Sequence, residues 1–496
     1  MKEAHKDKSG YSHILKYTSM FGGVQGLILL ASLVRNKFIA VLLGTGGMGL
    51  ASLLVSVQNF ASQCTNLGIS QGAIPRLSEC YERGDVEKLD YYIRVIRLWS
   101  LLAAVLGFLF CIIISPFIDE FSFTWGNHTL HFAMMGIAVS MAAISGGEMA
   151  IMKATRRLGA IAKVLVFSAL AGVVVSVPLY YFLFHSGIVP AIVLTAIATM
   201  LVTIAYSWRC YPFHFAFSRQ MLGDGFGMIR LGIAFVLAAA VGSCTEMLIR
   251  SYLNVEGGLA EVGLYNVGYM ITMTYAGMVF SAMETDFFPR LSGVCNNAEA
   301  TNLTVNKQIE VSLLMLSPML VALLAALPVL IPMLFSREFL PVVQMSQVAI
   351  LAMYFKVLTM PIAYITLARK DALSYLCLEA TSYAIMAWSI MVGFHYWGIL
   401  GTGVALVASH ALELVVIYCY AYWRYDYRST MAISRYAGIQ LLLGVLAYTV
   451  SSACSGWCYW IIEAALAIAS TAYSVNILRQ KTRLWEALMR KFKKVA

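Results

Sequence analysis

Apolar runs of about 20 residues follow one another along almost the whole chain, and this length suffices to cross a hydrocarbon layer of roughly 30 Å as a helix. Only 12% of the 496 residues are charged, against about 25% in a typical soluble domain. So little charge cannot cover a water-facing surface of this size. The pattern therefore predicts an all-α polytopic membrane protein. A β-barrel is disfavoured, because its strands would appear as alternating segments of roughly ten residues.

The runs predict about 14 membrane-spanning helices joined by short connections. Their expected ranges are 18–43, 48–73, 92–117, 130–152, 158–184, 187–208, 229–253, 262–287, 308–335, 341–367, 372–394, 397–422, 433–453 and 457–478. The longest connections are the polar stretches 76–90 and 290–307, so we expect no separate soluble domain.

Basic residues alternate between the connections. They occur in the N-terminal segment, in every second connection and in the C-terminal tail, as in Lys2, Arg76, Lys153, Arg209, Arg290, Arg369, Arg424 and Lys481. Because Lys and Arg are retained in the cytoplasm, this alternation predicts that both termini are cytoplasmic. It also accounts for the net charge of +10. We expect no nucleic-acid partner, since no basic face with interleaved aromatic residues lies outside the spans.

An internal repeat divides the chain. The pair Gly-Leu and the residues Pro-Arg-Leu-Ser mark the two ends of Gly49–Ser78 and, at the same spacing, the two ends of Gly263–Ser292. An arginine precedes each copy, Arg35 and Arg250. Parallel repeats of this kind are typical of transporters. The predicted organisation is an N-terminal six-helix lobe in residues 1–210, a second lobe in 211–428, two additional helices in 429–478 and a basic amphipathic cytoplasmic tail in 479–496.

The sequence indicates no metal site, no cofactor and no enzyme. Ten cysteines are present without a CxxC or Cys/His spacing. The outward connections are short and hold no His/Asp/Glu constellation for catalysis. Cys454 and Cys458, near the outer ends of two spans, are either a disulfide or two small apolar residues.

The second predicted span carries a polar stripe on one helical face, at residues Ser52, Ser56, Asn59, Gln63, Asn66 and Ser70. The amides of Asn59 and Gln63 cannot face lipid without losing hydrogen bonds. The stripe therefore lines a hydrated central path or bonds to neighbouring helices.

Charged residues inside the spans are the other candidates, because each is costly in a bilayer. The cations are Arg35, Lys37, Arg250 and Lys356, and the possible coupling acids are Glu246, Glu379 and Glu413. Glu246 and Arg250 are spaced for an ion pair on one helix. Arginine matches the oxygens of a phosphate, which favours an anionic substrate such as a diphosphate-linked lipid. Unpaired acids would instead suit a cation, and the coupling ion, H⁺ or Na⁺, stays open.

Residues Asn36–Leu50 resemble the end of the first span in polysaccharide flippases of the multidrug/oligosaccharidyl-lipid/polysaccharide (MOP) exporter superfamily. The matching positions are Lys37, Ala40, Gly44, Gly47 and Gly49. The nearest resemblance is to Wzx-type flippases for O-antigen or enterobacterial common antigen. The same superfamily includes cation-coupled multidrug exporters, which remain the alternative.

The resemblance implies two six-helix lobes that alternate between inward-open and outward-open states. Such a protein moves undecaprenyl-diphosphate-linked oligosaccharide, an O-antigen or similar repeat unit, from the inner to the outer leaflet of the bacterial inner membrane. Its expected partners are this substrate, membrane lipids, a polysaccharide polymerase and glycosyltransferases. Substrate contacts in the central cavity are then expected at Arg35, Lys37, Asn59, Gln63, Arg250 and Lys356.

Overall fold

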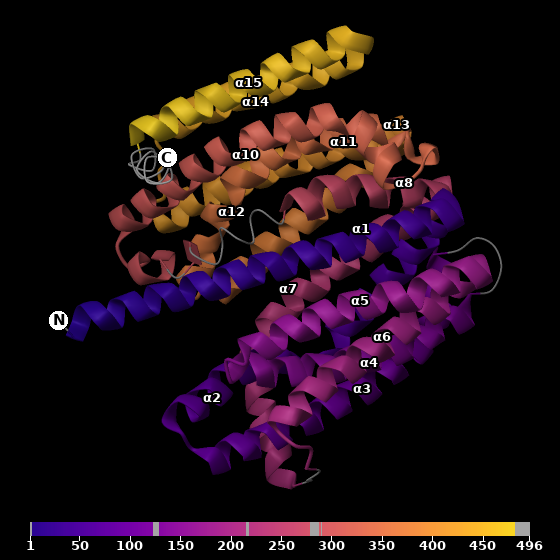
Figure 1. Ribbon diagram of the computed structural model, residues 1–496, viewed down its shortest axis with the longest axis vertical. Helices are drawn as coiled ribbons and strands as arrows, with labels where there is room; N and C mark the ends of the chain where they lie inside the picture. Colours follow the sequence, from indigo (N-terminus) through magenta and orange to yellow (C-terminus); the bar gives the residue numbers. More distant parts are fainter. Residues whose placement is uncertain (1, 123–127, 215–217, 278–286, 289, 482–496) are drawn as a thin grey trace, which may run out of the picture. The chain divides into compact units, whose positions relative to one another are not determined.

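The computed structural model describes residues 2–122, 128–214, 218–277, 287–288 and 290–481, with side chains from residue 23 onward except at 231, 234 and 235. Every regular element in these ranges is a helix, which confirms the predicted all-α class (Figure 1). Residues 482–496, most of the predicted amphipathic tail, lie outside the described residues, as does Pro289 of the second repeat copy.

The chain forms two compact units. Unit 1 comprises Met1–Gly263 with Leu334–Ser336, and unit 2 comprises Leu264–Met333 with Arg337–Ala496. The helices that begin in unit 1 are α1 (Lys2–Thr65), α2 (Ile69–Arg83), α3 (Val86–Ser122), α4 (Thr129–Ala154), α5 (Leu158–Leu183), the 3-10 turn η1 (Phe184–Gly187), α6 (Ile188–Cys210), α7 (Arg219–Gly257) and α8 (Leu259–Tyr269). These units are defined by packing, whereas the predicted lobes rest on the repeat, so the lobe boundaries stay a prediction.

Unit 2 continues from α8 into a π-helical segment and then into further long helices. These elements are η2 (Met270–Tyr275), α10 (Ala298–Leu334), the 3-10 turn η3 (Arg337–Phe339), α11 (Val342–Ile350), α12 (Ala352–Ala368), α13 (Ala372–Tyr425), α14 (Met431–Ala453) and α15 (Gly456–Lys481). The last two helices lie side by side in Figure 1. Gln440 of α14 bonds to Ser470 and Ser474 of α15 through its side-chain amide.

Ten segments of the described chain are long and apolar enough to cross a membrane. Three of them each contain two of the predicted spans: α1 is interrupted at Gly44, α5 and α6 are joined by η1, and α13 changes direction at Trp397 and Gly398. The eighth predicted span, 262–287, lies partly outside the described residues. This is the structure of a multi-pass membrane protein.

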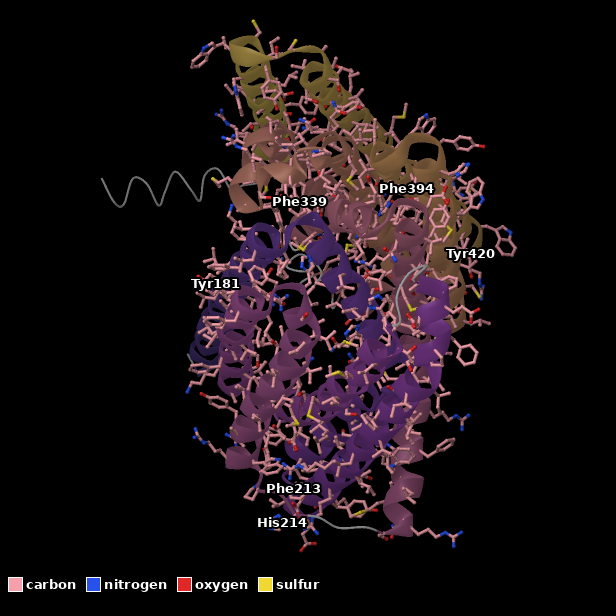
Figure 2. All side chains as sticks on the ribbon, turned by 90° about the vertical axis from the view of Figure 1, so that its right-hand side faces the viewer. Tyr181, Phe213, His214, Phe339, Phe394 and Tyr420 are labelled. Atoms are coloured by element: carbon pink, nitrogen blue, oxygen red, sulfur yellow. The ribbon has the colours of Figure 1, made fainter. Side chains whose placement is uncertain are left out.

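The outer faces of the helices are apolar, as lipid contact requires. Ile113, Val174 and Phe182 are 68%, 70% and 74% exposed. Tyr181, beside Phe182, also lies on the outside of unit 1 (Figure 2). Large side chains this exposed would be unfavourable in water but are stable in hydrocarbon.

The second predicted span is wrong in one respect. The sequence predicts a continuous helix over 48–73, but α1 ends at Thr65 and α2 begins at Ile69. Leu67 and Gly68 have φ values of 54° and 71°, and glycine tolerates this left-handed conformation. The backbone of Gly232 in α7 lies against Gly68, so a side chain there would also clash. The polar stripe is therefore divided between two helices.

The connection before α13 is stabilised by Asp371, which caps the helix. Its carboxylate accepts hydrogen bonds from the Ser374 backbone N–H at 3.2 Å and from the Tyr425 hydroxyl at 2.9 Å. The hydrogen bonds from Ser374 and Tyr425 hold the pKa of Asp371 below its usual value. Because Tyr425 is the last residue of α13, this carboxylate joins the two ends of the hairpin.

Candidate functional site

A cluster of charged side chains lies inside unit 2, between α12 and α13. Lys356 of α12 interacts electrostatically with Glu413 and Glu379 of α13, and with His410 one turn before Glu413. The three charged residues are half-buried and His410 is buried. The structure thus brings together a predicted substrate-binding cation and two predicted coupling acids.

The reversal inside α13 explains how two acids far apart in sequence come together. Trp397 and Gly398 leave the helical conformation, and Gly393 and Gly401 then pack backbone against backbone. A side chain at either glycine would clash with the other arm of this helical hairpin. Glu379 and Glu413 are separated from this turn by similar numbers of residues along the chain. They therefore lie at similar heights on the two arms of the hairpin.

His410 was missed by the sequence reasoning. Its Nδ1 lies 3.0 Å from the carbonyl oxygen of Leu406. Because a carbonyl only accepts hydrogen bonds, Nδ1 carries the hydrogen and the neutral ring keeps Nε2 as an acceptor. A signal was present in the sequence, since His410 and Glu413 are three residues apart and share a helical face within an apolar run.

In unit 1, Arg35 of α1 is a half-buried cation in a membrane-crossing helix. Its Nε is buried and has no hydrogen-bond partner among the described residues. Tyr180 of α5 is its electrostatic neighbour. The guanidinium therefore retains a donor that the described structure does not use.

Two further predicted cations of unit 1 make contacts with protein groups. The guanidinium of Arg250, on α7, donates to the Glu246 carboxylate at 3.1 Å, which confirms the ion pair predicted from their spacing. Arg250 is 7% exposed. The Lys37 ammonium donates to the carbonyl oxygen of Phe335, which packs with unit 1.

The polar stripe of α1 separates into two kinds of residue. Ser52 and Ser56 bond to backbone carbonyls of their own helix, those of Gly49 and Leu53. Asn59 is exposed and Gln63 half-buried, and neither amide is hydrogen-bonded within the described structure. The amides thus keep donor and acceptor groups that are available to water or a ligand. That all these residues line one chamber stays a prediction.

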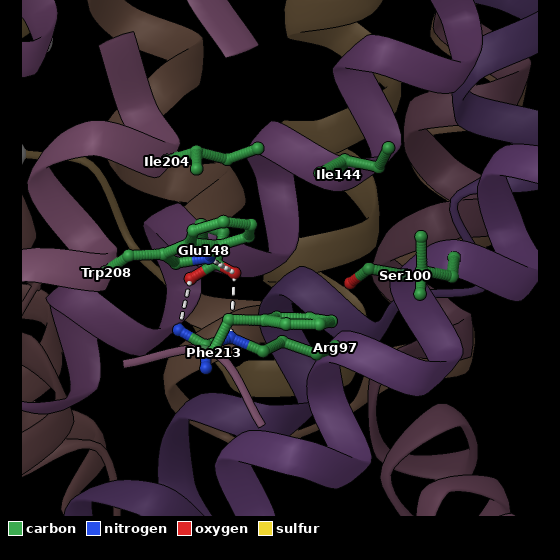
Figure 3. Close-up of a pocket in the computed structure, with 8 residues that line it drawn as sticks. Arg97, Ser100, Ile144, Glu148, Ile204, Trp208 and Phe213 are labelled. Atoms are coloured by element: carbon green, nitrogen blue, oxygen red, sulfur yellow. Dashed lines mark hydrogen bonds and ion pairs between the residues drawn. The ribbon is translucent and has the colours of Figure 1, made fainter. Parts of the chain in front are cut away.

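A second buried ion pair in unit 1 joins Arg97 of α3 to Glu148 of α4 (Figure 3). The side chains are 6% and 4% exposed, and Arg97 Nε lies 2.8 Å from Glu148 Oε1. Arg97 also donates to the carbonyl oxygens of Tyr211 and Pro212, just after α6. Ser207 and Trp208 of α6 donate to the same carboxylate.

This network lies beside a partly open pocket of about 200 Å³, lined by Arg97, Ser100, Leu101, Ile144, Glu148, Ile204, Trp208 and Phe213. The ring of Phe213 stacks on Trp208 and lies under the Arg97 guanidinium, at the end of unit 1 seen in Figure 2. Because the carboxylate and most guanidinium donors are hydrogen-bonded, the network holds α3, α4 and the chain after α6 together. Arg97 is not among the residues that the sequence predicted to be functional.

Within the described ranges, no group of three or more His, Cys, Asp or Glu residues is arranged to hold a metal ion. Cys454 and Cys458 are both free thiols in this structure. Of the two alternatives left open by the sequence, they therefore do not form the disulfide.

The sequence matches the model of the family described as polysaccharide biosynthesis protein over residues 10–344. The chain belongs to this family. Comparison with curated proteins gives no significant match.

Comparison with solved structures identifies the fold of this chain. An inward-facing multidrug resistance MATE family transporter of the MOP superfamily superposes with a TM-score of 0.67, at 14% identity over 82% of this chain and 96% of its own. The lipid II flippase MurJ, in an inward closed conformation, gives 0.61, at 12% identity over 94% and 99%. A MOP superfamily transporter from Pyrococcus furiosus, whose binding pocket is described as having reversed polarity, gives 0.55, at 12% identity over 83% and 95%. This protein has the fold of MOP superfamily transporters.

Proposed function

We propose that this protein is a non-enzymatic flippase for a lipid-linked oligosaccharide. Its substrate is an undecaprenyl-diphosphate-linked glycan, an O-antigen or similar repeat unit, carried from the inner to the outer leaflet of the bacterial inner membrane. The observation that carries the proposal is Arg35, whose buried Nε–H has no hydrogen-bond partner within the described residues of a membrane-crossing helix. A half-buried guanidinium with an unused donor suits a phosphate oxygen.

Membership of the polysaccharide biosynthesis family supports a glycan as the transported group. A protein of similar fold is described as a lipid II flippase, which supports lipid transfer as an activity of this architecture. In this proposal Arg35, Lys37, Arg250 and Lys356 hold the diphosphate. The amides of Asn59 and Gln63 contact sugar hydroxyls, because they keep unused donors and acceptors.

The cluster around Lys356 gives the proposal a coupling step. Glu379 and Glu413 neutralise the ammonium while no substrate is bound, since both interact with it electrostatically. Protonation of either carboxyl group removes that attraction and releases the ammonium to a diphosphate. Glu246 plays the same part toward Arg250, its ion-pair partner in unit 1. Proton binding at these acids would then favour substrate binding.

A cation-coupled antiporter is the second candidate, and the same cluster favours it. Two carboxylates surround a single ammonium, so one negative charge is in excess when His410 is neutral. An excess carboxylate inside a membrane protein suits a cationic substrate or a coupling Na⁺. A multidrug resistance MATE family transporter has a similar fold, which supports this second candidate function.

Transfer of a fluorescent polyprenyl-diphosphate oligosaccharide in proteoliposomes tests the flippase. We expect Arg35→Ala to slow transfer roughly tenfold or more, because a hydrogen bond to a charged group contributes about 1.5–3 kcal/mol. Arg35→Lys keeps the charge without the planar fork and should retain part of the rate. Lys163→Ala is the control, since Lys163 is an exposed basic residue of α5.

An unchanged transfer rate for Arg35→Ala in correctly inserted protein would refute this role. The antiporter predicts a different result. Glu379→Gln combined with Glu413→Gln would then abolish export of a cationic dye and leave glycan transfer as it was.

A further inference from the structure

Glu463 of α15 is a buried acid that the proposed mechanism does not use. Its side chain is 1% exposed, and neither carboxyl oxygen has a hydrogen-bond partner in the described part of the chain. It shares a helical face with Tyr459, one turn before it, and with Ser470, two turns after it. This face is the inner face of α15 within unit 2.

The neighbours of that face are known from its hydrogen bonds. The Tyr459 hydroxyl donates to the carbonyl oxygen of Ala325 in α10 at 2.8 Å. The Ser470 hydroxyl donates to the Gln440 side chain of α14 at 2.7 Å. Glu463 lies between these two residues, and its carboxyl group is therefore enclosed where α15 packs against α10 and α14.

Among the described residues of α10, α14 and α15, no cation acts on this carboxyl group. Its electrostatic neighbour is Tyr459, a neutral phenol on its own helix. The nearest ion pair on these helices, Lys481 with Glu310, lies about 27 Å along α15 at 1.5 Å per residue. A further phenol in the described structure belongs to Tyr354 of α12, whose ring lies against Gly444 of α14.

Other embedded acids in the described spans have partners. Glu148 bonds to Arg97, Glu246 bonds to Arg250, and Glu379 and Glu413 interact with Lys356. Glu463 is as buried as Glu148, since the two residues are 1% and 4% exposed. Unlike Glu148, it has no paired cation among the described residues. Burial of an ionised carboxylate without a partner is so costly that the group takes up a proton instead.

We propose that Glu463 is a proton-binding site, neutral in this conformation and separate from the coupling acids predicted from the sequence. The bound ligand is a proton, because one carboxyl group supplies two oxygens and a hard cation takes about six. Release of the proton requires that water reach the contact of α15 with α10 and α14. This inference does not depend on which substrate the protein carries.

Labelling with dicyclohexylcarbodiimide tests the site in the purified full-length protein. The protonated carboxyl group adds its oxygen to the central carbon and its proton to a nitrogen of the reagent. The O-acylisourea then rearranges to an N-acylurea with no atom lost. We expect the peptide that contains Glu463 to gain the mass of the whole reagent at neutral pH. Labelling should decline as the pH rises, because the reagent requires the protonated acid, and Glu463→Gln should abolish it.

Glu148 is the matched control, because it is as buried as Glu463 but its carboxylate oxygens are bonded to the Arg97 guanidinium. Its peptide should stay unlabelled. Equal labelling of the two acids, or labelling of Glu463 that does not change with pH, would overturn the proposal.

Infrared spectroscopy provides a measurement that does not depend on reagent access. A protonated carboxylic acid gives a carbonyl stretching band that a carboxylate lacks. We expect wild-type protein at neutral pH to show such a band and Glu463→Gln to lose it. A spectrum unaltered by this substitution would show that Glu463 is ionised.

Discussion

At the residue scale, the charges inside the spans differ in how far the protein satisfies them. Arg97 and Glu148 are bonded to each other and to neighbouring groups on nearly every side. Lys356 has electrostatic partners without a hydrogen bond in the described structure. Arg35 and Glu463 keep buried atoms with no partner there. The well-bonded pair is best explained by stability, and the less satisfied groups by function.

Removing one member of the buried pair should therefore destabilise unit 1. We expect Arg97→Gln to lower the free energy of unfolding by about 3–5 kcal/mol, because Glu148 keeps a buried, uncompensated charge. Replacing both, as Arg97→Met with Glu148→Leu, should recover most of the loss. Thermal unfolding in detergent measures the difference.

The exposed pair of Arg156 and Glu82 provides the comparison for that experiment, with side chains 68% and 57% exposed. Arg156→Gln should change stability by less than about 1 kcal/mol, because water screens an exposed pair. Equal losses for Arg97→Gln and Arg156→Gln would contradict a stabilising role for the buried network.

At the element scale, the repeated glycines act as contact points between helices. Gly49 and Gly263, which begin the two repeat copies, pack against each other within unit 1. A side chain on Gly49 would overlap the carbonyl oxygen of Leu259, and one on Gly263 would overlap that of Thr45. Small residues allow this close backbone approach, which is common where membrane helices cross.

Adding one methyl group at this crossing should be destabilising. We expect Gly49→Ala to lower the free energy of unfolding by about 1–3 kcal/mol, the usual cost of overpacking. Gly46→Ala is the control, because a Cβ there has nothing within 4 Å. Thermal midpoints in detergent compare the two variants, and matching midpoints would argue against a tight contact at Gly49.

At the scale of the whole molecule, the charge alternation predicts the orientation in the membrane. Both termini should be cytoplasmic, and the connection that holds Glu256 should face outward. We expect a green fluorescent protein fused after Ala496 to fluoresce in bacteria. Alkaline phosphatase should be active when fused after Glu256 and inactive when fused at the C-terminus. Phosphatase activity at the C-terminus would contradict an even number of spans.

The sequence by itself determined the helical class, the membrane location and the approximate spans, because apolar run length and charge are read residue by residue. It also predicted the ion pair of Glu246 and Arg250, since four residues on one helix are always neighbours. The resemblance carried by Lys37, Ala40 and the glycines agrees with the family that the chain matches.

Only the tertiary structure decided which residues distant in sequence come together. It placed Arg97 on Glu148, Lys356 beside Glu379 and Glu413, and Gly49 against Gly263. It also broke the second predicted helix at Leu67 and Gly68, where the backbone of α7 lies against the chain. These contacts depend on how helices cross and where hairpins turn. Neither is encoded in the local periodicity of apolar residues, which records only that a helix has a buried face.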